Sequence, residues 1–318
     1  MSDKIPLVSV SCITYNHVNY IRECIEGFLM QKTSFPFEVL IHDDASTDGT
    51  AEIIQEYQAK YPEIIKPILR KENLYSQGVR GINRFNFERV QGKYIALCEG
   101  DDFWTDPKKL QIQFDFMESH PEYSLCMHGR YVLNYIAKQY VCQKIRNNFP
   151  SEEKEFARQL MMGKQLHLTQ TMFFKTADYR TKESDIWRDT KDAPMADTQI
   201  AFHLALAGKV KLLKKYMATY RFAPGSITCP GDKFKREDFI KQARIAMKKM
   251  ADNNGCEDWW SEFERQLNSP AKMVKPPVSY RLLSPIYHAV KTPYGRIMFR
   301  KYLKSSVNKR IRLRLWIH

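Results

Sequence analysis

Residues 92–110 read GKYIALCEGDDFWTDPKKL, an apolar run that ends in three acidic side chains. The run 94–98 is typical of a buried strand. Glu99, Asp101 and Asp102 follow it directly. The next residues, TDP, predict a helix start, with Asp106 as the cap and Pro107 at the first helical position. Because a cap is already supplied, the acidic side chains before it need an explanation other than helix capping.

The alternation of an apolar strand with a helix occurs repeatedly before this stretch. Strands are predicted at residues 6–16, 37–46 and 64–72, and helices at 17–31, 46–62 and 84–92. Ser46 or Thr47 is the expected cap of the second helix. Four such alternations in about 120 residues predict an α/β fold with a mostly parallel central sheet and helices on both faces.

Polar clusters follow three of the predicted strands: ITYN at 13–16, HDDAS at 42–46 and EGDD at 99–102. In open parallel sheets, ligands bind outside the carboxyl ends of the strands, so the three clusters are expected on one rim. Carboxylates this close raise one another's pKa unless a cation lies between them. A hard divalent ion, Mg²⁺ or Mn²⁺, with phosphate oxygens and water as further ligands, fits such a group. Asp43 and Asp44 are equally consistent with turn residues near a positive helix end.

Composition and motifs exclude several classes of protein. The chain has 318 residues, of which 43% are hydrophobic, and this allows one large domain or a domain plus an appendage. It contains no apolar run long enough to span a membrane and no signal peptide pattern, so a cytoplasmic protein is expected. The seven cysteines form no CxxC pair, which favours reduced thiols. GxGxxG and GxxxxGK[ST] are absent, which argues against dinucleotide oxidoreductases and P-loop enzymes.

The positive charge is concentrated at the C-terminal end. The last acidic residue is Glu264, and 13 of the 50 Lys and Arg residues follow it, which leaves 37 basic against 36 acidic residues in 1–264. Residues 270–318 mix 12 basic residues with aromatic and apolar ones. This pattern favours contact with an anionic membrane surface, although RNA binding or packing on the body would also use it. Residues 229–318 are therefore interpreted as a separate helical, basic region.

Four stretches together resemble the family 2 glycosyltransferases, which have the nucleotide-sugar-binding GT-A fold. They are VSVSCITYNHVNYIRECIEGFLMQ, FEVLIHDDASTDGTAEII, GKYIALCEGDDFWTDPKKLQIQFDF, and ADTQIAFHLALAGKVKLL followed by TYRFAPGSI. The resemblance covers roughly residues 5–227 and implies a GT-A, Rossmann-like domain at 1–228. It also implies inverting transfer of a sugar from a nucleoside diphosphate donor to a hydroxyl acceptor.

For the donor, the resemblance implies that Thr14, Tyr15 and Asn16 line the pocket for the base and ribose. Asp44 would accept a hydrogen bond from the base. A carboxylate at that place favours a ring N–H donor, as in uracil or thymine, so UDP or dTDP is the expected nucleotide.

For the chemistry, the resemblance places Glu99, Asp101 and Asp102 in the family's acidic metal motif. Asp102 would coordinate Mn²⁺ or Mg²⁺, Asp101 would lie near the ribose or sugar, and Glu99 stands where many members have Asp. Asp197 matches the general base, which an inverting displacement needs in order to take the acceptor's proton. The alternative is that Asp197 only caps the helix that Gly208 ends.

Other side chains near these motifs have two interpretations. Trp104 could stack on a sugar ring or pack at a helix entry. Arg80 and Arg84 are candidates for a diphosphate contact. Ala223 stands where relatives often carry His, and Arg221 could supply that contact instead.

The predicted function is a metal-dependent glycosyltransferase for cell-surface polysaccharide, such as lipopolysaccharide or capsule, or for lipid-linked glycan in a bacterium. Its predicted partners are a nucleotide-sugar donor, a glycan or lipid-linked acceptor and the inner face of the membrane. No nucleic acid is expected, and oligomerisation is left open. The alternatives are a non-catalytic nucleotide-sugar-binding module and a nucleotidyltransferase on a similar sheet; the latter would carry a Gly- and Arg-rich loop after its first strand, which is absent here.

Overall fold

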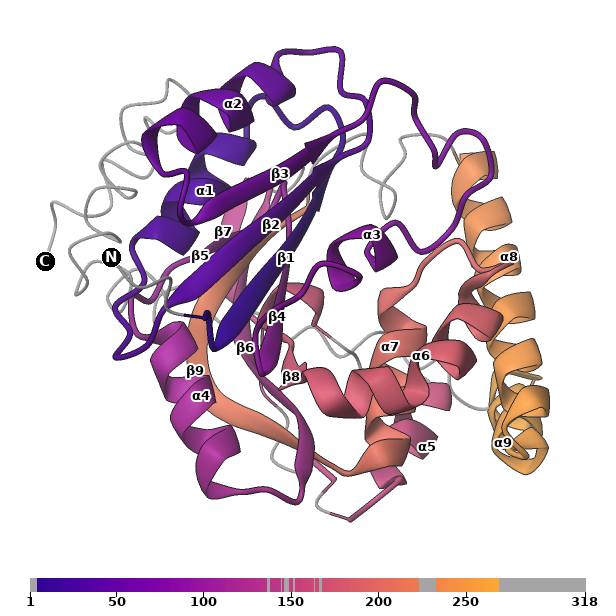
Figure 1. Cartoon of the computed structure of the whole chain (residues 1–318). Coiled ribbons are helices and arrows are strands. Elements are labelled where there is room, and N and C mark those ends of the chain that lie inside the picture. Colours follow the sequence, from indigo (N-terminus) through magenta and orange to yellow (C-terminus); the bar gives the residue numbers. More distant parts are fainter. Residues whose placement is uncertain are drawn as a thin grey trace, which may run out of the picture.

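The computed structural model describes residues 5–135, 138–143, 145, 149–150, 152–162, 164–165, 168–222 and 233–268. Within this part of the chain, the strands form one nine-stranded sheet in the order β3-β2-β1-β4-β8-β6-β9-β5, with β7 paired to β6 (Figure 1). Helices cover both faces of the sheet. The predicted α/β class is therefore confirmed.

The first half of the chain forms the parallel part of the sheet. Its apolar runs become strands paired side by side in one direction, as the sequence pattern predicts. Helix α1 buries Ile21, Cys24, Ile25 and Phe28 against them, which form one apolar face of the helix. The elements are β1 (Val8–Thr14), α1 (Ile21–Leu29), β2 (Phe37–Asp43), α2 (Thr50–Lys60), β3 (Ile65–Leu69), α3 (Arg84–Phe87) and β4 (Tyr94–Glu99).

The second half extends the sheet with strands of both directions. β8 is antiparallel to β4 and β6, whereas β9 runs parallel to β6 and antiparallel to β5. The sheet is therefore mixed as a whole, and the predicted parallel arrangement holds for β1 to β4. The elements are β5 (Phe103–Trp104), α4 (Lys109–Ser119), β6 (Tyr123–Asn134), β7 (Gln139–Cys142), α5 (Glu155–Met161), η1 (Thr169–Thr171), β8 (Phe173–Lys175), α6 (Thr176–Thr190), α7 (Asp197–Ala207), β9 (Lys209–Phe222), α8 (Lys233–Asn253) and α9 (Glu257–Asn268).

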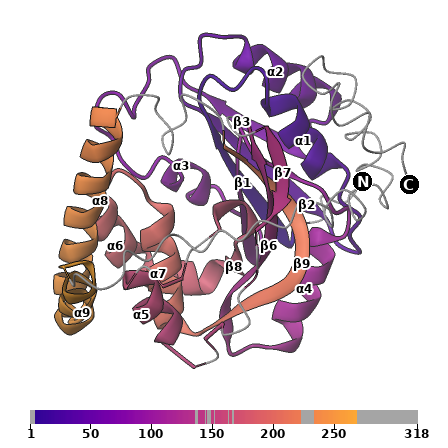
Figure 2. The same ribbon diagram turned by 180° about the vertical axis from the view of Figure 1, so that it is seen from behind.

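Two hydrophobic clusters lie on opposite faces of the sheet. One joins the strands to α1, α2 and α4, and the other joins them to α3, α5, α6 and α7. Helices α8 and α9 add Met250, Ala251, Cys256 and Trp260 to the second cluster and run along its outer side (Figure 2). The boundary proposed at residue 228 falls outside the described residues. Within the described part, no helix is long and apolar enough to cross a membrane.

Two predicted helix starts are wrong by a few residues. Helix α2 begins at Thr50, whose backbone N–H donates to Asp48 Oδ1 at 3.0 Å, because Ser46 is engaged by Asp43 in the preceding loop. Helix α4 begins at Lys109, because Asp106 accepts from the backbone N–H of Lys108 at 2.8 Å and forms a turn before the helix. The six described cysteines are free thiols, as expected.

Candidate active site

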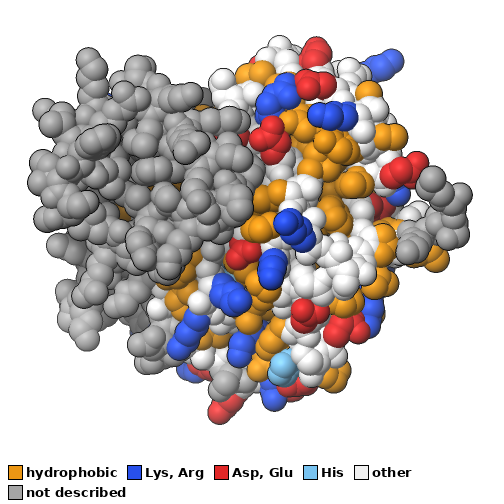
Figure 3. All heavy atoms as spheres, turned by 90° about the vertical axis from the view of Figure 1, so that its left-hand side faces the viewer, with side chains coloured by type: hydrophobic (Ala, Val, Ile, Leu, Met, Phe, Trp, Pro, Cys, Tyr) orange, Lys and Arg blue, Asp and Glu red, His pale blue; other side chains and the backbone are white. Residues whose placement is uncertain are grey.

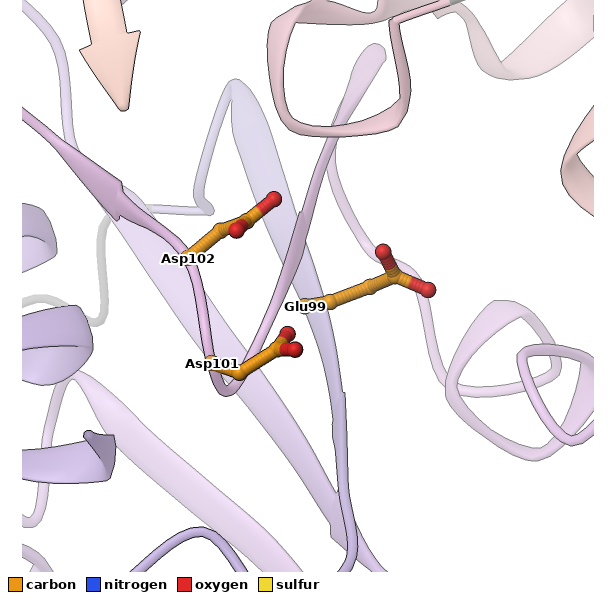
Figure 4. Close-up of side chains that lie close together, drawn as sticks. All are labelled: Glu99, Asp101 and Asp102. Carbon is orange, nitrogen blue, oxygen red and sulfur yellow. The ribbon is translucent and has the colours of Figure 1, made fainter. Parts of the chain in front are cut away.

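The acidic cluster lies in the turn between β4 and β5. Ligand oxygens of Glu99, Asp101 and Asp102 all lie within 4.8 Å of one another (Figure 4). Gly100 is required in this turn, because a Cβ there would lie 2.5 Å from Thr14 Oγ1. The backbone N–H of Gly100 donates to the carbonyl of Ile13 at 2.9 Å. The turn therefore packs directly against the end of β1, as the parallel topology predicts.

The electrostatics of this cluster favour a bound cation. Burial raises the pKa of Asp102 well above its usual value, and the charge of Asp101 adds to the effect. Burial raises the pKa of Glu99 in the same way, with further contributions from Asp101 and Asp197. Asp102 Oδ1 accepts the backbone N–H of Arg221 at 2.8 Å, but its buried Oδ2 has no hydrogen-bond partner among the described residues. This oxygen fits a metal ligand, because carboxylates are preferred by Mg²⁺ and Mn²⁺.

The predicted donor residues lie at the ends of β1 and β2. Thr14 is buried, and its carbonyl accepts the backbone N–H of Asp44 at 3.0 Å. Asn16 has a left-handed backbone, with φ of 53°, and its side-chain Oδ1 accepts the backbone N–H of Thr47 at 2.9 Å. Tyr15 lies between them and is 45% exposed. The structure thus brings Thr14, Asn16 and Asp44 together beside the acidic cluster.

Asp44 also fastens the loop that follows β3, a role that the sequence did not reveal. Its carboxylate oxygens accept the backbone N–H groups of Leu74 and Tyr75, each at 3.0 Å. Asn73 Nδ2 donates to the carbonyl of Asp44 at 2.9 Å. Because each carboxylate oxygen has two lone pairs, a base N–H could still bind there. The partners are backbone groups, which leave no mark in the residue types.

Asp197 is the first residue of α7, on the other half of the chain. Its Oδ1 accepts the backbone N–H of Thr198 at 2.8 Å, which agrees with a local role at the helix start. Its Oδ2 accepts the hydroxyl of Thr169 at 2.8 Å, a contact across the fold that a helix cap does not need. Its charge raises the pKa of Glu99, so the two carboxylates lie close enough to interact.

Arg221 contacts the turn that carries the acidic cluster. Its side chain is 1% exposed and lies over the ring of Phe103, with 4.3 Å between guanidinium carbon and ring centroid. Nη1 donates to the carbonyl of Asp101 at 2.5 Å, and Nη2 pairs with Glu23 of α1. The guanidinium is thus engaged with the protein in this structure, and Ala223 lies outside the described residues.

The remaining candidates make packing contacts within the described residues. Trp104 is buried, meets Phe28 edge to face and donates its Nε1–H to the carbonyl of Gln170 at 3.0 Å. Arg80 lies over the ring of Tyr75 at 4.4 Å, and Arg84 lies over the ring of Phe85 at 4.8 Å.

The mixed α/β sheet with acidic residues after a central strand is the arrangement of the GT-A fold, and solved structures of that fold align with it. TarS of S. aureus, solved with UDP-GlcNAc, aligns with a TM-score of 0.60 over 81% of this chain and 71% of that chain, at 19% identity. The mannosyltransferase PcManGT of Pyrobaculum calidifontis, solved with GDP-Man and Mn²⁺, aligns with a TM-score of 0.50 over 97% of this chain and 82% of that chain, at 13% identity.

The chain belongs to glycosyl transferase family 2, whose sequence model matches residues 9–182. The protein Rv1520 of Mycobacterium tuberculosis, itself uncharacterised, is 49% identical over 121 residues, which are 38% of this chain and 34% of that protein. TuaG of Bacillus subtilis, which is named after teichuronic acid biosynthesis, is 40% identical over 113 residues, which are 35% of this chain and 42% of TuaG. The chain therefore spans about a third to two fifths of these curated relatives. The predicted family and fold are confirmed.

Proposed function

We propose that this glycosyltransferase moves a sugar with inversion from a nucleoside diphosphate donor, UDP or dTDP, to a hydroxyl group of a glycan or lipid-linked acceptor. The observation that carries the proposal is the cluster of Glu99, Asp101 and Asp102 after β4, together with Asp197, whose charge contributes to the raised pKa of Glu99. Two structures of the same fold support a nucleotide-sugar donor, since TarS was solved with UDP-GlcNAc and PcManGT with GDP-Man.

The donor half of the site consists of residues from β1, β2 and the acidic turn. Thr14, Tyr15 and Asn16 would contact the base and ribose, and Asp44 would accept a base N–H. Asp102 would hold Mn²⁺ or Mg²⁺ through its unpartnered Oδ2, with Glu99 and Asp101 beside it. The bound ion would offset the charge that builds on the departing diphosphate.

The acceptor half depends on Asp197. As the acceptor oxygen forms its bond to the anomeric carbon, its proton passes to the Asp197 carboxylate. The bond from the anomeric carbon to the diphosphate oxygen breaks on the opposite face, and the electron pair leaves with the nucleoside diphosphate. The configuration at the anomeric carbon is inverted as a result.

The acceptor is proposed to be a cell-surface polysaccharide, such as capsule or lipopolysaccharide, or a lipid-linked glycan. The name of TuaG supports a surface polysaccharide. The basic, aromatic residues 270–318, which lie outside the described residues, are consistent with a peripheral enzyme on the inner face of the membrane.

Thermal unfolding with UDP, dTDP and GDP, each with and without Mn²⁺, tests the donor site. At about 100 times its dissociation constant, a ligand adds roughly 2.7 kcal/mol, which raises the midpoint by several degrees. We expect UDP or dTDP to do so only with Mn²⁺, and Asp102→Asn to lose the effect. The matched control is Asp115→Asn, an exposed carboxylate on α4 that should respond like the unchanged protein. If no nucleotide moves the midpoint, the proposed donor site is wrong.

Turnover separates the enzyme from a binding module and from a nucleotidyltransferase. With a sugar donor, the enzyme should release the free nucleoside diphosphate, whereas a nucleotidyltransferase would release pyrophosphate from a nucleoside triphosphate. Binding without any release of product would favour the binding module.

A further inference from the structure

The short turn η1 (Thr169–Thr171) contacts Asp197, the proposed general base, on one side and the segment after the acidic cluster on the other. Thr169 is 8% exposed, and its hydroxyl donates to Asp197 Oδ2 at 2.8 Å. The other carboxylate oxygen accepts a backbone N–H from its own helix. Thr169 therefore ties Asp197 to a different part of the fold.

The same turn is fixed on its other side to the segment that follows the acidic cluster. The carbonyl of Gln170 accepts Nε1–H of Trp104, two residues after Asp102, at 3.0 Å. The side-chain oxygen of Gln170 accepts a hydrogen bond from Arg130 at 3.3 Å. The carbonyl of Thr171 accepts Nε2–H of the buried Gln113 at 2.9 Å. These contacts give η1 a defined place relative to the acidic turn.

We propose that Thr169 is a positioning residue, which orients the carboxylate of Asp197 toward the acceptor hydroxyl and fixes its distance from the acidic cluster. This inference rests on the proposed function. A hydroxyl that donates to one carboxylate oxygen restricts rotation of the carboxylate group. Because a displacement of about 1 Å can cost about a hundredfold in rate, a single such contact has a measurable effect.

Two substitutions at this position separate the hydroxyl from the volume of the side chain. Thr169→Val keeps the shape and removes the donor, whereas Thr169→Ser keeps the donor. We expect Thr169→Val to lower kcat about tenfold to a hundredfold with KM for the donor unchanged, because the contact acts on the base rather than on donor binding. Thr169→Ser should stay within about threefold of the unchanged enzyme. Thr169→Ala, which also lacks the hydroxyl, serves if the Val variant does not fold.

The matched control is Thr171→Val in the same turn. The Thr171 hydroxyl donates to the carbonyl of Leu168 at 2.7 Å, so this variant removes a buried hydrogen bond of the turn without touching Asp197. The activity measured is release of UDP from UDP-GlcNAc with Mn²⁺, or from whichever sugar donor the thermal shifts select. Binding of UDP with Mn²⁺ by calorimetry shows whether each variant keeps the donor site.

The outcomes distinguish this inference from the proposed function. A fall in kcat for Thr169→Val, rescued by Ser and not shared by Thr171→Val, supports the positioning role. If Asp197→Asn is inactive but Thr169→Val is fully active, the positioning role is overturned. The same holds if Thr169→Val and Thr171→Val lose activity equally. In both cases the assignment of Asp197 as the general base still stands. If Asp197→Asn is fully active, the base assignment itself is wrong and the role of Thr169 falls with it.

Discussion

Lys109, the first residue of α4, is an unusual residue seven positions after Asp102. Its side chain is fully buried, with Nζ 3.9 Å from the ring centroid of Trp104 and donating to Gln113 Oε1 at 2.7 Å. These neighbours are an aromatic ring and an amide, neither of which is ionised. Burial lowers the pKa of the Lys109 amine to about 7. The free energy of unfolding should therefore depend on pH through the Lys109 amine.

Replacing this amine should remove that pH dependence. Between about pH 7 and about 10 the unfolded chain holds a proton on Lys109 that the folded chain does not, so stability from this group rises with pH. Below the pKa of Lys109 in the folded protein, the amine is charged in both states, and the full cost of burying that charge lowers the stability. We expect Lys109→Met to raise the unfolding midpoint by several degrees near pH 6, with the gain shrinking toward about pH 10.

Thermal unfolding of both proteins across that pH range measures the difference, and the exposed neighbour Lys108→Met is the control. Other groups that ionise at high pH affect both proteins alike, so the difference isolates Lys109. A gain in unfolding midpoint that stays constant with pH would show that the pKa of Lys109 is not lowered in the folded protein.

Length explains only part of what the sequence could predict, since the long strands β6 and β9 were missed as well as the shortest ones. The strands β1, β2 and β4 are apolar runs of six or seven residues, and α1 shows one clear apolar face, so their types followed from periodicity. The strands β5 and β8 have two and three residues, which is too short for any period to appear. Their antiparallel pairing makes the sheet mixed, and the resemblance gave no sign of it.

The same limit explains what was missed at the site. The acidic cluster was predictable because adjacent residues at the end of one strand must lie together. Thr169 lies in a three-residue turn, and its partner Asp197 is far along the chain. Arg221 was predicted through the resemblance alone, and its pairing with Glu23 of α1 depends on the tertiary fold.

The contact between α6, α7 and α8 is organised by Asp189, the penultimate residue of α6. Its carboxylate, buried within the protein, accepts from His203 of α7 at 2.8 Å, from Asn253 of α8 at 2.6 Å and from Asn254 at 2.9 Å. Burial raises the pKa of Asp189, but hydrogen bonds from His203 and Arg188 and from the two amides outweigh this, so the pKa is well below its usual range. One side chain thus joins the C-terminal helices to the body.

We expect Asp189→Asn to cost roughly 3–5 kcal/mol in the free energy of unfolding at neutral pH, because the side chain loses its charge and one of the two oxygens that accept these buried hydrogen bonds. A depressed carboxylate pKa gives stability that is present above the unfolded pKa, near 4, and is lost as pH falls through the folded value. The difference in the free energy of unfolding between the unchanged protein and Asp189→Asn should therefore become smaller in acid.

Urea unfolding at neutral and acidic pH measures this gap, and Asp192→Asn is the control. Asp192 follows α6 and pairs with Lys249 of α8, the helix that also carries Asn253. Its side chain is 62% exposed, so losing this ion pair should cost less than about 1 kcal/mol in the free energy of unfolding. Equal losses in the two variants would show that Asp189 does not organise this contact.

At the scale of the whole molecule, the two halves of the sheet divide the proposed work. The parallel half carries the proposed donor residues at the ends of β1 and β2, and its register places Ile13 of β1 beside Glu99 of β4. The mixed half carries η1 and Asp197, the proposed general base. The sequence predicted the first half from strand order, whereas Asp197 entered through the resemblance alone.

The surface of the body carries charges of both signs. Figure 3 shows one face, where acidic, basic and hydrophobic side chains are interspersed over the described part. This agrees with 37 basic against 36 acidic residues in 1–264. The last 54 residues therefore carry +13 of the net charge of +14, and any attraction to an anionic surface should come from them.

Binding to lipid vesicles tests this attribution. The full chain should sediment with vesicles that contain anionic lipid and remain in solution with neutral ones, since each Lys or Arg near such a surface contributes about 1 kcal/mol. Raising salt from ~0.05 to ~0.5 M should release it, because the Debye length shortens severalfold. A chain that ends at residue 268 should not sediment, yet should keep its thermal shift with UDP and Mn²⁺. If that shortened chain sediments as well as the full one, the attraction lies in the body; if neither sediments, the basic residues serve another partner.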